Sequence, residues 1–256
     1  MLSCVIPAYN EPHLQRTIDS LLLNAEGDIE IIVVLDGYWP EPSLKVNQKV
    51  HLLHFGKNKG MRAAINAGIA LSKGEFILKS DAHCMFGKGY DKILLENAES
   101  NSVYIPRRFK LDTEKWEILP NRPIDYEKLI IHETYHKFHG EEWKTRAIKR
   151  KDILIDETMS FQGSCWMMSR KHWDSVIGEL DENTYGPFLQ EPVEVGMKTW
   201  QSGGKLLVKK NTWYAHKHRD IKRSHHIKEA EANIIYARVL DIWKDEYEKL
   251  KLRFGI

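Results

Sequence analysis

An aspartate and a histidine stand two positions apart just after an apolar run, and together they could hold a divalent metal ion. The run is Phe76-Ile77-Leu78, and the two side chains are Asp81 and His83. Side chains at positions i and i+2 of an extended segment point to the same side, so these two can converge on one ligand. A strand that simply ends in polar turn residues would show the same pattern. The tripeptide alone therefore leaves both interpretations open.

The segments around this motif predict the element order of an α/β domain. Strands are expected at residues 2–6, 30–35, 50–55 and 76–78, with helices near 12–22 and 61–71. The run at 30–35 is apolar on both faces, as a parallel sheet covered by helices requires. It ends at Asp36, and ligands of such sheets bind beyond the carboxyl ends of the strands. We therefore predict that residues 1–109 form a Rossmann-like nucleotide-binding half with a mostly parallel central sheet.

The rest of the chain shows a weaker pattern. Residues 110–222 are predicted to complete the domain, and residues 110–159 within them form an insert of short polar segments. Residues 223–256 are expected to be a C-terminal helical extension packed on the outside of the domain. Its predicted apolar face consists of Ile234, Ile235, Ile242, Trp243 and Leu250.

The composition favours a compact protein of one or two domains. The chain has 256 residues, 42% of them hydrophobic, and its net charge of +2 is too mild for a dedicated nucleic-acid binder. The three cysteines are far apart and lack C-x-x-C spacing, so free thiols in a reducing compartment are the simpler account. No apolar run approaches the roughly 20 residues that span a bilayer, and no signal peptide follows Met1. We expect no transmembrane segment and a cytoplasmic location.

Four features at predicted strand ends could meet one ligand, and together they resemble the family-2 glycosyltransferases of the GT-A fold. They are Pro7-Ala8-Tyr9-Asn10-Glu11, Asp36-Gly37, Asn58-Lys59-Gly60 with Arg62, and Asp81-Ala82-His83. The resemblance implies that residues 1–109 bind a nucleotide sugar and that residues 110–222 form the acceptor side. It also implies that Asp36 accepts a hydrogen bond from a uracil imide or a ribose hydroxyl. The residues that it places against the donor in this half are Pro7, Ala8, Tyr9, Glu11, Asp36, Asn58, Arg62 and Asp81.

A narrower resemblance concerns the metal motif. Ser80-Asp81-Ala82-His83-Cys84 is similar to the Asp-Ser-His-Cys segment of polypeptide N-acetylgalactosaminyltransferases, whose aspartate and first histidine bind manganese. A second histidine follows in that family in a Gly-His-x-x-Arg context, and Ala215-His216-Lys217-His218-Arg219 stands in the corresponding place. The resemblance implies Asp81, His83 and His216 as ligands of Mn²⁺, with Mg²⁺ as the alternative, and Arg219 as a phosphate contact. One carboxylate with two imidazoles suits manganese better than magnesium, and zinc would accept the same ligands.

Glu191-Pro192 is the candidate catalytic segment. It lies where inverting family-2 enzymes carry Glu-Asp, whose aspartate activates the acceptor. The retaining N-acetylgalactosaminyltransferases have Glu-Asn there, so the resemblance favours retention, with an inverting family-2 enzyme as the alternative. Glu191 would then orient the donor sugar or the acceptor, unless it or Glu194 pairs with a lysine such as Lys198. Phe188 could stack on a sugar or acceptor ring or belong to the core.

Two interpretations from other classes stay open. His132-Glu133-Thr134-Tyr135-His136 matches the H-E-x-x-H pattern of zinc metallopeptidases, with both histidines on one face if the segment is helical. A catalytically inactive nucleotide-sugar-binding module is the other. Against the second stands the joint presence of Asp36, the three metal ligands and Arg219.

The sequence does not identify the acceptor, which could be a sugar, a protein or a phosphate-bearing molecule such as a nucleic acid or a lipid-linked phosphate. The insert carries aromatic and basic residues that suit the last class. They are Trp116, Tyr135, Trp143, Lys144, Arg146, Lys149, Arg150 and Lys151. Solvated charges beside a protein or sugar acceptor are the competing interpretation.

Overall fold

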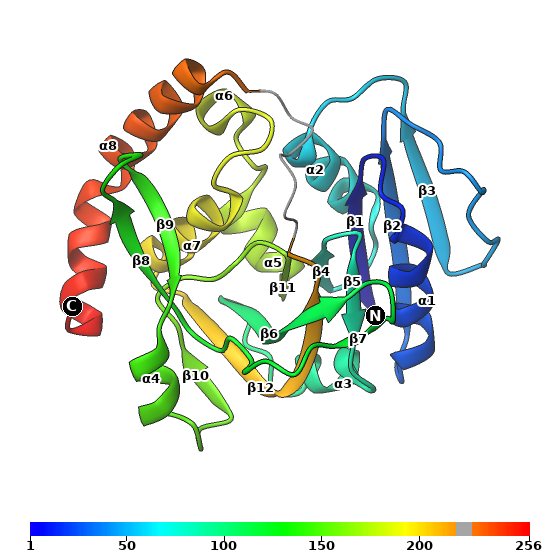
Figure 1. The fold of residues 1–256 in the computed structure, drawn as a ribbon, viewed down its shortest axis with the longest axis horizontal. Coiled ribbons are helices and arrows are strands. Elements are labelled where there is room, and N and C mark those ends of the chain that lie inside the picture. The colour runs from blue at the N-terminus through cyan, green and yellow to red at the C-terminus, as the bar shows by residue number, and fades with distance from the viewer. Residues whose placement is uncertain (219–226) are drawn as a thin grey trace.

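Four parallel strands form the N-terminal half of the sheet in the computed structural model, which describes residues 1–218 and 227–256 (Figure 1). They are β1 (Leu2–Ala8), β2 (Ile29–Asp36), β3 (Val50–Phe55) and β4 (Phe76–Ser80), in the order β3-β2-β1-β4. The two predicted helices are α1 (Leu14–Asn24) and α2 (Met61–Leu71). Every residue of β2 is buried, because helices cover both faces of the sheet. The predicted parallel α/β half is confirmed.

The second half extends the same sheet. β11 (Cys165–Ser169) lies antiparallel between β4 and β6 (Ser102–Asp112), and β12 (Lys205–His216) runs parallel to β6. Three short strands pair at the margins, namely β5 (Cys84–Phe86) and β10 (Ile155–Glu157) with β12, and β7 (Glu117–Ile118) with β6. The helices of this half are α3 (Tyr90–Leu95), α5 (Arg170–His172), α6 (Glu182–Tyr185) and α7 (Glu191–Gln201), with a π-helical turn at Trp173–Ile177.

Apolar side chains on the two faces of the sheet form separate clusters. In β1, Cys4 and Ile6 belong to the cluster that α1 and α3 cover, whereas Val5 belongs to the cluster that α2 and α7 cover. This alternation is the two-residue period of a strand. The second cluster also takes in Leu129 and Phe138 of the insert, so the insert is anchored to the core.

Residues 110–159 are more regular than the sequence predicts. β8 (Glu127–His132) and β9 (Lys137–Glu142) form an antiparallel hairpin, which stands beside the C-terminal helix in Figure 1. The short helix α4 (Lys144–Lys149) follows. The hairpin therefore joins the insert to the end of the chain.

The H-E-x-x-H segment lies at the turn of this hairpin and not in a helix. His132 Nδ1 accepts hydrogen bonds from the backbone N–H groups of Thr134 and Tyr135 at 3.3 and 3.4 Å. A hairpin turn does not place His132 and His136 on one helical face. The zinc peptidase interpretation is wrong for this physical reason.

The C-terminal helix α8 (Glu229–Phe254) is confirmed, but its apolar face differs from the predicted one. The helix packs against α6, α7 and β9. Its buried residues are Ile235, Val239, Trp243, Tyr247 and Leu250. Ile234 and Ile242 are exposed, because the face that meets the domain follows steps of four residues from Ile235 to Tyr247 and then a step of three to Leu250.

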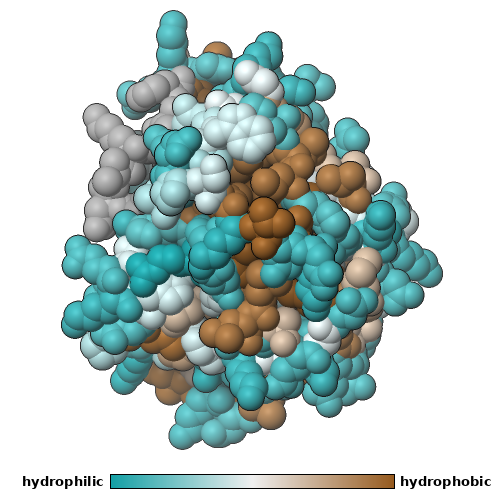
Figure 2. Space-filling model, turned by 90° about the vertical axis from the view of Figure 1, so that its right-hand side faces the viewer, coloured by the Kyte–Doolittle hydropathy of each residue, from teal (hydrophilic) through white to brown (hydrophobic). Residues whose placement is uncertain are grey.

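Apolar side chains form a band across the side of the molecule that carries β3 and α1 (Figure 2). Cys4, Cys84 and Cys165 are buried free thiols, as predicted, and the cytoplasmic location stays a prediction. In the part of the chain that the structure describes, no helix is long and apolar enough to cross a membrane.

Two leucines of α8 test the corrected apolar face. Leu250 is 3% exposed and Leu252 is 84% exposed. Leu250→Ala should lower the free energy of unfolding by about 2–5 kcal/mol, since it removes a buried side chain and leaves a cavity. Leu252→Ala should stay within about 0.5 kcal/mol of the wild type. Urea denaturation measures both, and equal effects would contradict the observed orientation of the helix.

Candidate active site

Three predicted metal ligands converge beyond the carboxyl ends of the strands. Asp81 follows β4 directly, His83 precedes β5, and His216 ends β12, where it pairs with Cys84 of β5. The His83 and His216 Nε2 atoms are 3.0 Å apart. Asp81 Oδ2 lies 3.3 Å from His216 Nε2 and 3.9 Å from His83 Nε2. Among the described residues this is the one cluster of histidine, cysteine and carboxylate groups with metal-site spacing.

The arrangement fits a divalent ion. Nitrogen and oxygen ligands lie about 2.0–2.2 Å from such an ion, so atoms 3–4 Å apart can share one. The Glu11 carboxylate lies 2.9 Å from His83 Nδ1, which therefore donates to it and leaves Nε2 with a lone pair facing the cluster. Glu11 was predicted to contact the donor. In the structure its carboxylate orients the candidate metal ligand His83, and the residue also lines the cavity.

The protonation states suit the same role. Burial lowers the pKa of His216 to about 4 and also lowers the pKa of His83, so both imidazoles are neutral near pH 7. Burial alone would raise the pKa of Asp81, but Lys79 and His216 hold it well below its ordinary value. The cluster therefore offers two neutral nitrogens and one carboxylate to a cation.

Lys79 is a site residue that the sequence interpretation missed. Its buried Nζ donates to Asp81 Oδ1 at 2.6 Å and to the Gly163 carbonyl at 2.5 Å, and lies 3.8 Å from Glu191 Oε2. Burial alone would lower its pKa, but Asp81 and Glu191 raise it, so the lysine is charged. The signal was present in the sequence, because Lys79 stands two positions before Asp81 and so points to the same side of the strand.

Glu191 opens α7 and is buried. Its Oε1 accepts a hydrogen bond from Trp166 Nε1, and its Oε2 faces Lys79. Burial raises the pKa of this carboxyl group. The lysine pairing considered for Glu191 or Glu194 is formed by Glu194, which pairs with Lys198 at 2.7 Å, while the lysine beside Glu191 is Lys79. Glu191 is thus fixed from two sides next to the metal cluster.

A cavity of about 690 Å³ opens in front of these groups, a size typical of ligand sites. Its wall on the far side comes from β9 of the insert, and Phe188 lines it as well. The predicted site residues that line it are Pro7, Ala8, Tyr9, Glu11, Asp36, Asp81, His83, Phe188, Glu191 and His216. Arg219 lies outside the described residues.

Asp36 holds the loop that precedes α2. Its carboxylate accepts hydrogen bonds from the backbone N–H groups of Lys59 at 2.6 Å and Gly60 at 2.9 Å, and from Asn58 Nδ2 at 3.0 Å. Asn58 is not among the cavity-lining residues. Asp36 itself lines the cavity. Its contact with a nucleoside stays a prediction.

Arg62 corrects the sequence interpretation, which placed it against the donor. Its side chain is 0% exposed and forms an ion pair with Glu194. It also donates to the Leu189 carbonyl at 2.6 Å and lies over the Tyr185 ring at 4.4 Å. A fully buried and paired guanidinium cannot touch the donor in this structure. It fixes the segment before Glu191 instead, a role that depends on a partner 132 residues away in the chain.

Of the basic residues of the insert, Lys137 lines the cavity, whereas the five proposed for an anionic acceptor do not. Arg150 donates to Asp156 at 2.6 and 2.7 Å, and Arg146 lies 3.4 Å from the same carboxylate. Lys144, Lys149 and Lys151 are also absent from the residues that line the cavity. Of the three candidate aromatic residues, Trp143 packs on the core and Trp116 lies 4.4 Å from the Arg16 guanidinium.

A family model described as glycosyl transferase family 2 matches residues 3–176. The chain belongs to glycosyl transferase family 2. Polypeptide N-acetylgalactosaminyltransferase 6 of Bos taurus is 25% identical over 272 residues, which cover 98% of this family-2 chain and 43% of that protein. The uncharacterized glycosyltransferase EpsJ of Bacillus subtilis (strain 168) is 28% identical over 210 residues, which cover 72% of this chain and 60% of that protein. The chain thus spans less than two thirds of the length of either relative.

Similarity in structure gives the fold. The crystal structure of GalNAc-T7 with UDP, GalNAc and Mn²⁺ matches with a TM-score of 0.78 at 19% identity, covering 97% of this family-2 chain and 50% of that chain. The predicted GT-A fold is confirmed.

The buried state of His216 predicts an acid-sensitive stability. In the unfolded chain its pKa is near 6.5, whereas in the folded chain it is about 4. Between these values the unfolded chain binds a proton that the folded chain does not, so stability is present above 6.5 and is lost as pH falls. In EDTA, His216→Gln should show a smaller drop in urea midpoint between about pH 7 and pH 5 than the wild type. His136→Gln, at the exposed hairpin turn, should keep the wild-type drop, and a matching drop in His216→Gln would contradict the assignment.

Proposed function

We propose that this chain is a metal-dependent glycosyltransferase that moves a sugar from a UDP-sugar to an acceptor and uses Mn²⁺. The observation that carries the proposal is the convergence of Asp81, His83 and His216 in the wall of a large cavity. UDP and Mn²⁺ are both named for the GalNAc-T7 crystal structure, which shares the fold. Two imidazoles in the ligand set rank manganese ahead of magnesium.

In this proposal the chain's own residues bind and orient the donor. Lys79 fixes one oxygen of Asp81, so that Oδ2 faces the two histidines. Glu11 fixes the ring of His83 through Nδ1. Pro7, Ala8 and Tyr9 line the side of the cavity where β1 ends. When bound, a divalent ion would neutralise the charge that develops on the departing diphosphate.

We further propose that transfer proceeds with retention of anomeric configuration. Support comes from α7, whose second residue is Pro192 and therefore offers no carboxylate beside Glu191. Glu191 itself is held by Trp166 and Lys79, which suits a residue that orients a substrate. An inverting reaction would need another cavity carboxylate as the base.

Ligand removal tests the metal site. His83→Ala should abolish manganese-dependent UDP binding in titration calorimetry, because it removes one of only three protein ligands and the remaining two hold the ion too weakly. Glu11→Gln should weaken manganese binding about 10- to 100-fold, since the partner that orients His83 loses its charge. His132→Ala should match the wild type. Full UDP affinity of the wild type in EDTA would show that the metal assignment is wrong.

Turnover tests the activity itself. We expect one UDP-sugar in a panel to release UDP in the presence of Mn²⁺, and the Asp81→Ala variant to release none above background. A catalytically inactive binding module would bind UDP but release none from any donor. With the active donor, proton NMR of the first product gives its anomeric configuration, and an inverted product would refute retention.

A further inference from the structure

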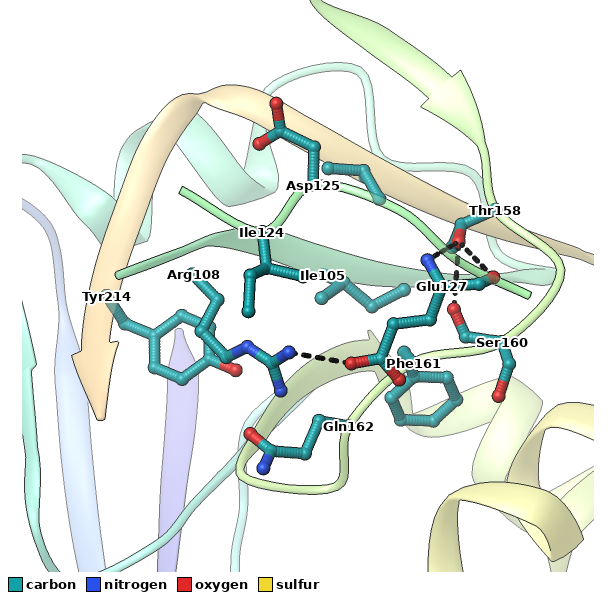
Figure 3. Close-up of a pocket in the computed structure, with 11 residues that line it drawn as sticks. Ile105, Arg108, Ile124, Asp125, Glu127, Thr158, Ser160, Phe161, Gln162 and Tyr214 are labelled. Carbon is teal, nitrogen blue, oxygen red and sulfur yellow. Dashed lines mark hydrogen bonds and ion pairs between the residues drawn. The ribbon is translucent and has the colours of Figure 1, made fainter. Parts of the chain in front are cut away.

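A small polar recess adjoins the large cavity on the side of the insert. It has a volume of about 10 Å³, which is room for about one water-sized group. Figure 3 shows the Arg108 side chain crossing it between Tyr214 and Glu127. Six of its lining residues also line the large cavity, so the two spaces are adjacent. These six are Arg108, Ile124, Glu127, Ser160, Phe161 and Gln162.

Arg108 has hydrogen-bonding capacity that the described residues do not use. Its side chain is 7% exposed, and Nη2 donates to Glu127 Oε1 at 2.7 Å. Its Nε and Nη1 are buried and have no partner in the described structure. Leaving a buried donor unsatisfied is costly, more so when it is charged, so such groups mark a place where a ligand or water belongs. The adjacent Arg107 differs, because its Nε and Nη2 both donate to Asp125 at 2.7 and 2.8 Å.

The opposite side of the recess is equally fixed. The Thr158 hydroxyl accepts a hydrogen bond from the Glu127 backbone N–H at 3.1 Å, and the Glu127 carbonyl accepts one from the Ser160 N–H at 3.0 Å. These bonds hold the start of β8, so the Glu127 carboxylate stays opposite Arg108 (Figure 3). The pair therefore presents donors and an acceptor at fixed positions.

The charge of the recess selects the class of ligand. Arg108 and Glu127 cancel, the lining carboxylate of Asp125 is paired with Arg107, and the remaining walls include Ile105, Ile124 and Phe161. A phosphate placed here would be repelled by the Glu127 carboxylate and would gain little from an arginine that is already paired. A hydroxyl group suits the site, because it can accept from Arg108 and donate to Glu127. The apolar walls would cover the carbon skeleton that bears it.

The recess is also close in the chain to the metal cluster. Gln162 lines it, the Gly163 carbonyl accepts from Lys79, and the Ser164 carbonyl accepts from the Asp81 backbone N–H at 2.8 Å. Three consecutive residues thus connect the recess to the metal ligands. A ligand with several hydroxyl groups could place one in the recess and another near the donor.

We propose that Arg108 and Glu127 form an acceptor subsite that binds a hydroxyl group of a neutral sugar, which rests on the proposed glycosyltransferase function. A sugar provides a second hydroxyl group for the recess besides the one that is glycosylated. A single serine or threonine side chain provides no second hydroxyl group, and the phosphate of a phosphate-bearing acceptor is repelled by the Glu127 carboxylate. The subsite therefore separates neutral glycans from the other two acceptor classes.

Ligand-observed NMR in the presence of UDP and Mn²⁺ tests the subsite without requiring turnover. The probes are the methyl β-glycosides of glucose, galactose and N-acetylglucosamine, a serine-containing peptide amide, and glycerol 3-phosphate. We expect saturation transfer to at least one glycoside and to neither of the other probes. Binding of the peptide or the phosphate in place of every glycoside would overturn the proposal, as would binding of none.

Variants locate the binding. Arg108→Lys keeps the positive charge beside Glu127 but removes the unused guanidinium donors, and should weaken glycoside binding by roughly 10- to 100-fold. Glu127→Gln should weaken it in the same direction. Arg107→Lys is the matched control, because it makes the same exchange at the adjacent position and keeps a positive charge beside Asp125, and it should bind the glycoside like the wild type. Unchanged binding in Arg108→Lys would overturn the proposal.

A UDP titration in each sample separates this proposal from the proposed function. Glycoside binding that depends on Arg108, in a protein that never binds UDP, would refute the donor site and support the recess. UDP binding together with a glycoside affinity that does not change in Arg108→Lys would support the donor site and refute the recess as a subsite. Thermal unfolding of each variant confirms that it is folded.

Discussion

The buried charge of Lys79 constrains the whole site. A lysine removed from water must be paired, and breaking such a pair by deleting one partner costs about 3–5 kcal/mol. Its partners come from different parts of the fold, since Asp81 follows β4, Gly163 precedes β11 and Glu191 begins α7. One ammonium group thus ties the strand ends of the first half to the helix of the second. The position of the metal ligand and that of the candidate catalytic residue are therefore set together.

The insert and α7 meet through a second link, which gives the cavity its other wall. Gln190 has a left-handed backbone conformation, with φ of 52°, which is uncommon for a residue other than glycine. Its Nε2 donates to the Phe138 carbonyl of β9 at 2.8 Å. The hairpin is thereby attached directly before Glu191. Recognisable motifs build the side of the cavity that carries the candidate metal ligands, whereas a segment without such motifs builds the side that faces it.

Local patterns predicted the parallel half of the fold and the proximity of Asp81 and His83, because those depend on short-range rules, whereas His216 was indicated only by the family resemblance. The doubly apolar run at 30–35 required a covered parallel strand, and the spacing of Asp81 and His83 placed both on one side. The role of Arg62 could not be predicted, since it depends on Glu194 far along the chain. The apolar face of α8 was misjudged because neighbouring isoleucines at 234 and 235 fit two faces equally well until the partner surface is known. The recess at Arg108 likewise arises only from the packing of β6 against the insert.

The register of β12 makes the candidate metal cluster depend on long-range strand pairing. His216 reaches the cluster only when β12 has paired with β6 and β5, and it is 133 residues from His83 in the chain. Closing so long a loop is entropically costly, and parallel pairing over such separations is slow. During synthesis, Asp81 and His83 leave the ribosome long before His216 does. An ion that requires all three would therefore bind almost solely to the finished sheet and, by mass action, shift the folding equilibrium toward it.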